Sequence, residues 1–82
     1  MIKVVLRFQG MRPEGELREK LDGNNETVVE VEDRTRLKNL LESLHIEPAG
    51  KLIRINQQAV FDMETRVHDH DLIEIFGLYA GG

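Results

Sequence analysis

The feature that most constrains this chain is one stripe of leucines. Four leucines repeat at the i, i+3, i+4 and i+7 spacing of a single helix face: Leu37, Leu40, Leu41 and Leu44. They predict a helix over residues 36–45, with a side-chain oxygen of Thr35 or Asp33 capping its start and Pro48 beyond its end. A helix with one apolar face has to bury that face against another element.

Strand patterns occupy most of the other residues. In residues 2–8 apolar side chains alternate along the chain, which is typical of a half-buried strand. Strand-like patterns also cover residues 26–32, 51–56, 59–61 and 71–76. Between the first two of these strands, residues 16–21 have the leucine spacing of one helical turn.

The order strand, strand, helix, strand, short strand, strand predicts an α+β fold. A single helix covers one face of a sheet, and a strand–helix–strand crossover implies some parallel pairing. We therefore predict a β-grasp architecture, in which a mixed four- to five-stranded sheet packs on one main helix. We assign residues 1–78 to this domain and residues 79–82 to a flexible C-terminal tail.

The composition excludes several classes of function. The net charge of −4 disfavours nucleic-acid binding, because phosphate neutralisation requires a basic surface. The chain has no cysteine, and therefore no disulfide, cysteine–zinc site or thiol nucleophile. No apolar run reaches transmembrane length and residues 1–7 lack the apolar core of a signal peptide, so we expect a cytoplasmic protein without membrane contact. We expect no cofactor and no enzymatic activity of its own, because no catalytic triad, phosphate loop or carboxylate pair is visible.

The last two residues, Gly81 and Gly82, are the candidate chemical site. Terminal glycines add nothing to a core, but a chain end without side chains is thin enough to enter a narrow channel. An extended tail starting at Tyr79 reaches about 13 Å at ~3.3 Å per residue. Its useful group is the Gly82 carboxylate, which becomes a reactive acyl group when it is joined to AMP. The dipeptide alone favours a frayed end, whereas the dipeptide together with the β-grasp order before it favours a working tail.

Four segments carry a resemblance to a known family. They are residues 40–44 at the helix end, 53–56 in the third strand, 67–76 leading into the last strand, and 80–82 at the terminus. Together they resemble the ThiS/MoaD group of ubiquitin-like sulfur carriers, over the whole chain. There are departures from the family pattern: His70 stands where the family has a glycine between two aspartates, and Gly77 and Leu78 replace two prolines. The replacement of the prolines leaves the exact partner open. The short stretch between the helix and the third strand resembles ThiS, whereas the length of 82 residues and the loop in the first half resemble MoaD, so the branch of the family stays open as well.

The resemblance implies a function for the tail. An adenylating enzyme of the ubiquitin-activating type would activate Gly82, and sulfur would be installed there as a thiocarboxylate, with Tyr79, Ala80 and Gly81 providing reach. A sulfur-accepting synthase of molybdopterin, tungsten cofactor or thiamin thiazole synthesis would receive the sulfur. Two alternatives stay open: conjugation of the same tail to lysines of target proteins, and a β-grasp interaction domain whose tail is a spectator. Because cysteine is absent, a carried sulfur cannot be a persulfide of this chain.

A sheet with one helix leaves its second face open to a partner. The strand alternation places apolar and basic residues on that face or beside the tail: Val5, Arg7, Leu52, Arg54, Leu72, Phe76 and Leu78. We predict that these residues form a docking patch next to the tail, in which Arg7 and Arg54 pair with acidic residues of the partner. The alternative is the ordinary exposure of single apolar side chains.

The run His68, Asp69, His70 and Asp71 has two interpretations. Histidine and carboxylate side chains bind zinc or nickel. Neighbours in an extended segment point to opposite faces, however, so this run offers two histidines on one side and no clear third ligand. We favour a polar turn before the last strand, and we predict no metal site.

Overall fold

The computed structural model describes residues 1–78, and the expected tail at residues 79–82 lies outside the described residues. Residues 1–78 form five strands and two helices, in the order β1 (Ile2–Gln9), α1 (Glu16–Glu19), β2 (Glu26–Val31), α2 (Leu37–Ser43), β3 (Lys51–Ile55), β4 (Gln58–Ala59) and β5 (Leu72–Gly77). No helix in this part of the chain is long and apolar enough to cross a membrane.

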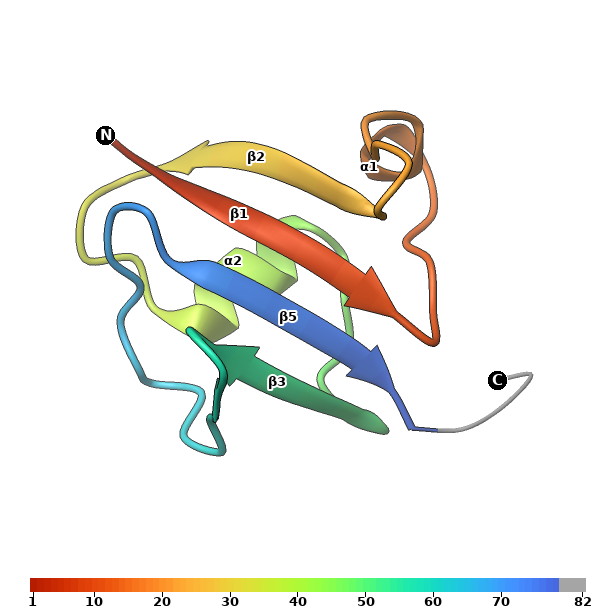
Figure 1. Cartoon of the computed structure of the whole chain (residues 1–82). Helices are drawn as coiled ribbons and strands as arrows, with labels where there is room; N and C mark the ends of the chain where they lie inside the picture. Colours follow the sequence, from red (N-terminus) through yellow and green to blue (C-terminus); the bar gives the residue numbers. More distant parts are fainter. Residues whose placement is uncertain (79–82) are drawn as a thin grey trace.

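The strands form one mixed sheet in the order β2-β1-β5-β3-β4. β1 pairs antiparallel with β2 and parallel with β5, and β5 pairs antiparallel with β3. The parallel pair joins the first and last strands of the chain in the middle of the sheet (Figure 1). The predicted β-grasp fold, with a mixed sheet on one main helix, is confirmed.

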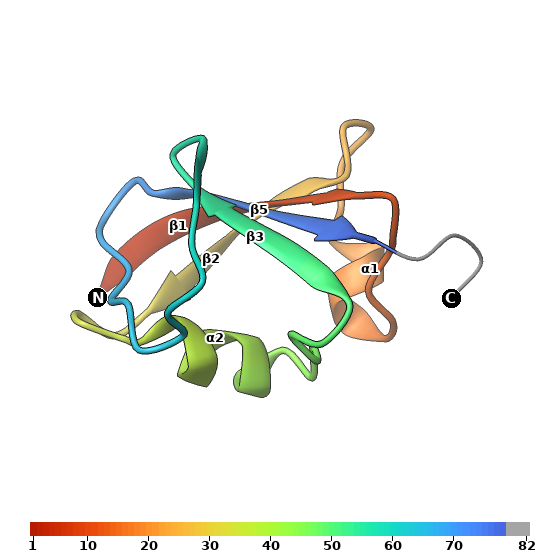
Figure 2. The same cartoon turned by 90° about the horizontal axis from the view of Figure 1, so that it is seen from below.

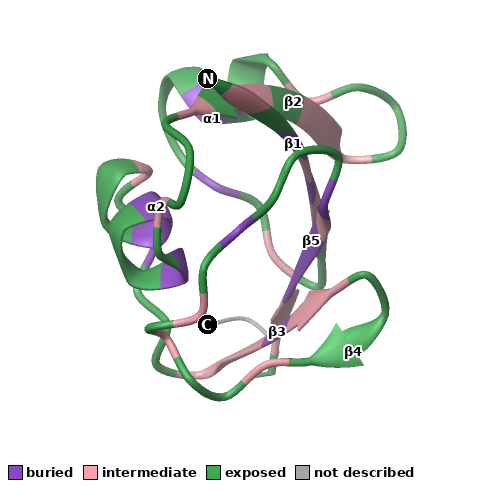
Figure 3. Ribbon diagram, turned by 90° about the vertical axis from the view of Figure 1, so that its left-hand side faces the viewer, coloured by how far each residue is buried: buried purple, intermediate pink, exposed green. Residues whose placement is uncertain are grey.

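Both helices lie on the same side of the sheet, as Figure 2 shows, and the core fills the space between α2 and the strands. Leu37, Leu40 and Leu41 of the leucine stripe are at most 1% exposed, and Leu44 packs at the edge of the core. The strands and the segment before β5 supply the other main core residues: Val4, Leu6, Phe8, Ile53, Val67, Ile73 and Ile75. In Figure 3, buried residues lie on α2 and along β5, on either side of the interior. The opposite face of the sheet is therefore left without a helix in the described chain.

The start of α2 differs from the prediction. The residue at the cap position is Arg36, and no side chain of residues 1–78 caps it by a hydrogen bond. Instead the N–H of Leu37 donates to the Thr65 carbonyl at 2.7 Å, and the N–H of Lys38 donates to the Met63 carbonyl at 2.9 Å. The Thr35 hydroxyl donates to the Glu32 carbonyl, so the expected cap by Thr35 or Asp33 is wrong. A backbone segment distant in sequence satisfies these free N–H groups in its place.

The end of α2 also comes earlier than residue 45. His45 adopts a left-handed conformation with φ of 58°, and the Ile46 N–H donates back to the Leu41 carbonyl at 2.9 Å. This is the pattern of a helix closed by a left-handed residue just past its end. The helix therefore stops at Ser43, before Pro48 is reached.

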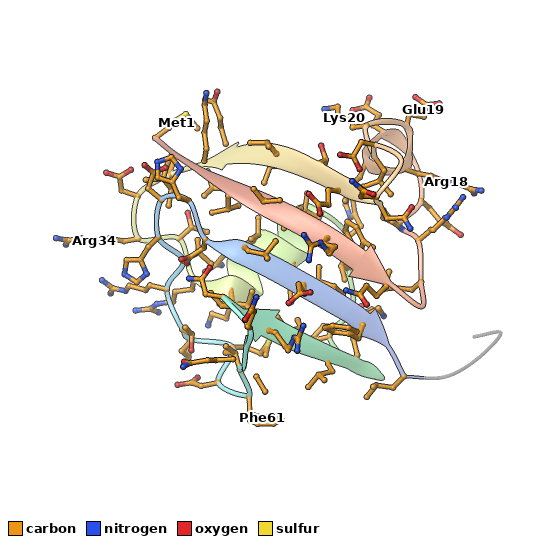
Figure 4. The ribbon with its side chains drawn as sticks, in the orientation of Figure 1. Met1, Arg18, Glu19, Lys20, Arg34 and Phe61 are labelled. Atoms are coloured by element: carbon orange, nitrogen blue, oxygen red, sulfur yellow. The ribbon has the colours of Figure 1, made fainter. Side chains whose placement is uncertain are left out.

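The short fourth strand is displaced relative to the prediction. Asn56 and Gln57 have φ of 51° and 72°, which makes a tight turn directly after β3. Pairing thus begins at Gln58 and covers only Gln58–Ala59, not residues 59–61. Phe61 lies past the strand, is 82% exposed and points away from the body of the protein (Figure 4).

Candidate functional site

Hydrogen bonds connect the segment before β5, residues 68–71, to Asn56 at the end of β3; we call this connection the joint. The Asp71 carboxylate is buried and accepts hydrogen bonds from Asn56 Nδ2 at 2.8 Å and from the His68 N–H at 2.7 Å. Asn56 Oδ1 in turn accepts a hydrogen bond from the Leu72 N–H at 2.9 Å. Asp71 and Asn56 therefore fix the first residue of β5 against the end of β3.

The same joint is tied to β1. His70 has a φ of 69°, as expected for a residue at the family's glycine position, and its N–H donates to the Lys3 carbonyl at 2.7 Å. The Lys3 N–H donates to Asp69 Oδ1 at 2.8 Å. These bonds confirm the polar turn predicted for residues 68–71. Within residues 1–78 no three histidine, aspartate or glutamate side chains gather as metal ligands.

The open face of the sheet brings six of the predicted docking residues together in three rows. The rows cross the strands and follow one another toward the C-terminal end of β5. The first, apolar row is Val28, Val5 and Leu72, and the second, ionic row is Glu26, Arg7, Glu74 and Arg54. The third row is Gln9, Phe76 and Leu52. The seventh predicted residue, Leu78, follows β5 and is 59% exposed. Figure 1 shows this face toward the viewer, with α2 behind it.

The ionic row is held by a network of short contacts. Arg54 Nε and Nη2 donate to Glu74 Oε1 at 3.1 and 2.8 Å. Glu74 Oε2 accepts from Gln9 Nε2 at 3.2 Å and lies 3.5 Å from Arg7 Nη1. Arg7 also bonds to Glu26, with 2.6 Å between Nε and Oε2. Both oxygens of Glu74 are thus used, although the residue lies on the open face and is only 2% exposed.

The two arginines have partners within the chain, which changes the expectation for them. The hydrogen bond to Glu26 raises the pKa of Arg7 above its ordinary value against the opposing effect of desolvation, so its guanidinium is charged at any physiological pH. The Arg54 guanidinium lies 4.9 Å above the centre of the Phe76 ring, a cation–π contact. Arg7 pairs with Glu26, and Arg54 pairs with Glu74. The acidic partners of both arginines are therefore residues of this protein.

Sequence reasoning missed several residues of this face. Glu74, Glu26, Gln9 and Val28 were not among the predicted docking residues, although they share its rows. Strand alternation was the available signal, because it places Glu74 between Leu72 and Phe76 on the outer face. What alternation could not supply is the register that sets Arg7, Glu74 and Arg54 side by side.

The end of β5, which we call the tail base, is fixed by close backbone contacts. Gly77 lies against Gly10: a Cβ added at Gly77 would be 2.7 Å from the Gly10 carbonyl oxygen and 3.0 Å from Met11 Cβ. The Leu78 N–H donates to the Gly50 carbonyl at 3.0 Å. The chain is therefore held between β1 and β3 up to Leu78. The predicted site residues Tyr79, Ala80, Gly81 and Gly82 lie outside the described residues.

Comparison with known families decides the relationship. The model of the ThiS family matches residues 14–82, which is most of the chain. The chain belongs to the ThiS family. Membership of the ThiS family confirms the resemblance found in the sequence, and it supports a ubiquitin-like sulfur-carrier role.

Solved structures agree with the ThiS family assignment at the level of the fold. A protein assigned as molybdopterin converting factor subunit 1 from Pyrococcus furiosus is 20% identical, with a TM-score of 0.64 over 94% of this chain and 98% of that one. SAMP1 from Haloferax volcanii is 15% identical, with a TM-score of 0.64 over 98% and 99%. A chain from the complex of subunits 1 and 2 of molybdopterin-converting factor of Helicobacter pylori 26695 is 20% identical, with a TM-score of 0.56 over 99% and 100%. Comparison with the curated proteins gives no match.

Proposed function

We propose that this protein is a sulfur carrier whose working group is the Gly82 carboxylate. The observation that carries the proposal is that one strand, β5, bears the centre of the open face and ends at the tail base, in a chain of the ThiS family. A partner that binds the open face would receive the chain end at a defined place, because the Leu78 N–H is hydrogen-bonded to the Gly50 carbonyl. The protein acts as a substrate of other enzymes and does not catalyse the transfer itself.

The proposed chemistry has two steps. First, the Gly82 carboxylate oxygen attacks the α-phosphorus of ATP, and pyrophosphate leaves, which gives an acyl-adenylate. Second, a sulfide-level sulfur nucleophile forms a bond to the acyl carbon, and AMP leaves with the electron pair of the broken C–O bond. The product is a thiocarboxylate, and no redox step is required when the donor is sulfide. An adenylating enzyme of the ubiquitin-activating type supplies the ATP site.

A sulfur-accepting synthase is the second proposed partner. The Helicobacter pylori relative is found in a complex of subunits 1 and 2 of molybdopterin-converting factor, and this chain aligns over 99% of its length with a chain of that complex. By analogy, we propose that the open face and the tail of this protein engage a synthase subunit. Molybdopterin, tungsten cofactor and thiamin thiazole synthesis are the pathways proposed for it.

Adenylation can be tested by exchange of labelled pyrophosphate into ATP. The full chain is mixed with ATP and the adenylating enzyme from the same genome. We expect exchange that depends on the chain and disappears when Gly82 is deleted, since the reacting carboxylate is then displaced by one residue. Asn24→Ala is the control, because Asn24 is exposed in the turn before β2 and its backbone bond to Asp22 is kept; this variant should retain exchange. Exchange that persists without Gly82 would contradict the proposal.

Conjugation to lysines begins from the same acyl-adenylate, so pyrophosphate exchange does not distinguish it from sulfur transfer. The two uses of the tail are distinguished by their products. Cleavage of cell extracts after aromatic residues such as Tyr79 would leave residues 80–82 on a conjugated lysine. Lysines that carry this Ala-Gly-Gly remnant, lost when Gly82 is deleted, would show conjugation. A spectator tail predicts instead that cells tolerate removal of Gly81 and Gly82 together.

A further inference from the structure

Glu74 is the most unusual residue of the open face. No element of residues 1–78 covers this face, yet Glu74 is 2% exposed because the arginine side chains of neighbouring strands lie over it. A buried carboxylate is costly unless its charge is compensated and its oxygens are hydrogen-bonded. Arg54, Arg7 and Gln9 meet both conditions here. The ionic row is thus internally satisfied before any partner arrives.

The charges of the ionic row cancel. Arg7 and Arg54 supply two positive charges, and Glu26 and Glu74 supply two negative charges within contact distance. A carboxylate brought to this face would meet the arginines first, but each arginine already contacts a glutamate of this chain, which lies beneath or beside it. The attraction of the carboxylate to the arginines would therefore be offset by repulsion from the glutamates. The face therefore has little capacity to select an acidic partner, although two arginines lie at its centre.

The flanks of the ionic row are apolar and pre-ordered. Val5 and Leu72 lie on one side of the row, and Phe76 and Leu52 lie on the other. The Arg54 guanidinium is held over the Phe76 ring by its two bonds to Glu74. The side chains of Arg7 and Arg54 are only 35% exposed, so most of their surface is already withdrawn from water before a partner docks.

From this arrangement we propose that the open face docks an uncharged, apolar patch of a partner protein, and that Glu74 is the residue that makes this docking possible. The inference rests on the proposed carrier function, because it concerns the partner that receives the tail. Neutral hydrogen-bond acceptors on the partner suit the outer N–H groups of the arginines. Carboxylates do not suit them, because their charge is already matched within the chain. The tail base begins at Gly77, directly after Phe76, and this continuity sets the occupant as the adenylating enzyme that acts on the tail.

The role of Glu74 follows from desolvation. If Glu74 were neutral, docking of an apolar patch would remove water from an Arg54 guanidinium that has no counter-charge. Leaving one member of a hydrogen-bonded charge pair buried alone is strongly unfavourable and acts on the dissociation rate. Glu74 is therefore a specificity-determining residue of the face without having to touch the partner.

The salt dependence of dissociation tests the proposal on the unmodified protein. The probe is the adenylating enzyme from the same genome, immobilised, with the full chain in solution. Between about 50 and about 500 mM NaCl, we expect the dissociation rate to change less than about threefold, because a neutral interface has few ion pairs for salt to screen. The association rate is read separately, since the net charge of −4 steers encounter from a distance. A dissociation rate that rises more than about tenfold with salt would overturn the proposal.

Two variants with the same change in net charge sharpen the test. Glu74→Gln should raise the dissociation rate about tenfold or more. Glu30→Gln, an exposed glutamate of β2 outside the three rows, should leave the dissociation rate within about twofold, since its charge is solvated. Equal effects of the two variants would contradict the role of Glu74. The unmodified protein keeps the salt test decisive if Glu74→Gln fails to fold.

The outcomes of these experiments distinguish a failure of the docking inference from a failure of the proposed carrier function. Tail chemistry with salt-sensitive, Glu74-independent binding would overturn this inference and leave the carrier function standing. Salt-insensitive binding that depends on Glu74, without any tail chemistry, would support the docking surface and contradict the carrier function. No binding at micromolar concentration, or a dimer of this chain that buries the open face, would overturn the inference.

Discussion

At the residue scale, single polar side chains keep the tail-bearing strand in place. Asp71 links Asn56 and His68 at the start of β5, and Gly77 fits against Gly10 at its end. Between these two points lies Glu74, which neutralises the arginines of the neighbouring strands. The position of β5 therefore depends on a few residues whose replacement has a defined physical consequence.

Asp71→Asn should lower the free energy of unfolding by about 1–3 kcal/mol, because the new amide group places a donor where the buried carboxylate accepts two hydrogen bonds. Urea denaturation measures the change. The control is Asp33→Asn, whose carboxylate is 72% exposed and has only a 3.6 Å contact with the N-terminus. We expect the control to change stability by less than about 0.5 kcal/mol. Equal effects at the two positions would argue against a role for the joint.

Gly77→Ala should disturb the tail base. The added Cβ would lie 2.7 Å from the Gly10 carbonyl oxygen, so β5 must shift away from β1, at a cost of about 1–3 kcal/mol. Gly23→Ala is the matched control, because no other part of residues 1–78 lies within 4 Å of its added Cβ. Unfolding and pyrophosphate exchange are measured together. We expect Gly77→Ala to reduce both stability and exchange and Gly23→Ala to reduce neither; an unchanged Gly77→Ala variant would contradict the close fit.

At the element scale, α2 holds the sheet from one side only. Leu40 is 1% exposed, and Leu40→Ala should lower the free energy of unfolding by about 2–5 kcal/mol through lost burial and a residual cavity. Glu42→Ala, on the exposed side of the same helix, should stay within about 0.5 kcal/mol. Urea denaturation of both variants tests this, and a small effect of Leu40→Ala would mean that the stripe is not the core.

The elements that carry strong periodicity could be predicted, and their ends could not. The leucine stripe and the alternation in β1 and β5 determine which side chains face inward, and the polar run at residues 68–71 located the turn before β5. The start of α2, however, depends on carbonyls of Met63 and Thr65, which follow the helix by some twenty residues in the chain. The end of α2 depends on the left-handed conformation of His45, a residue type that rarely adopts it.

The candidate site was predictable to a similar degree. Alternation alone places Arg7, Arg54 and Glu74 on one face. Their contact depends on strand register, and Arg7 and Glu74 are 67 residues apart in the sequence. Local sequence patterns carry no information on a contact between residues so far apart in the sequence. For this reason the arginines were expected, from the sequence alone, to pair with acidic residues of a partner.

At the scale of the whole molecule, one strand in the middle of the sheet, β5, bears the centre of the open face and ends at the tail base. The helices cover the other side, so a partner can approach the open face and the tail base together (Figures 1 and 2). The body carries a net acidic charge, whereas the ionic row is neutral. This arrangement suits a carrier that is recognised through its body and modified at its end.

The most direct test of this account is the intact mass of the protein after incubation with ATP, the adenylating enzyme from the same genome and sulfide. The account predicts a gain equal to the mass difference between sulfur and oxygen, located in the C-terminal peptide. The gain should be absent without ATP and absent when one alanine is added after Gly82. No change in mass under conditions where the enzyme is active, or the same gain with the blocked terminus, would contradict it.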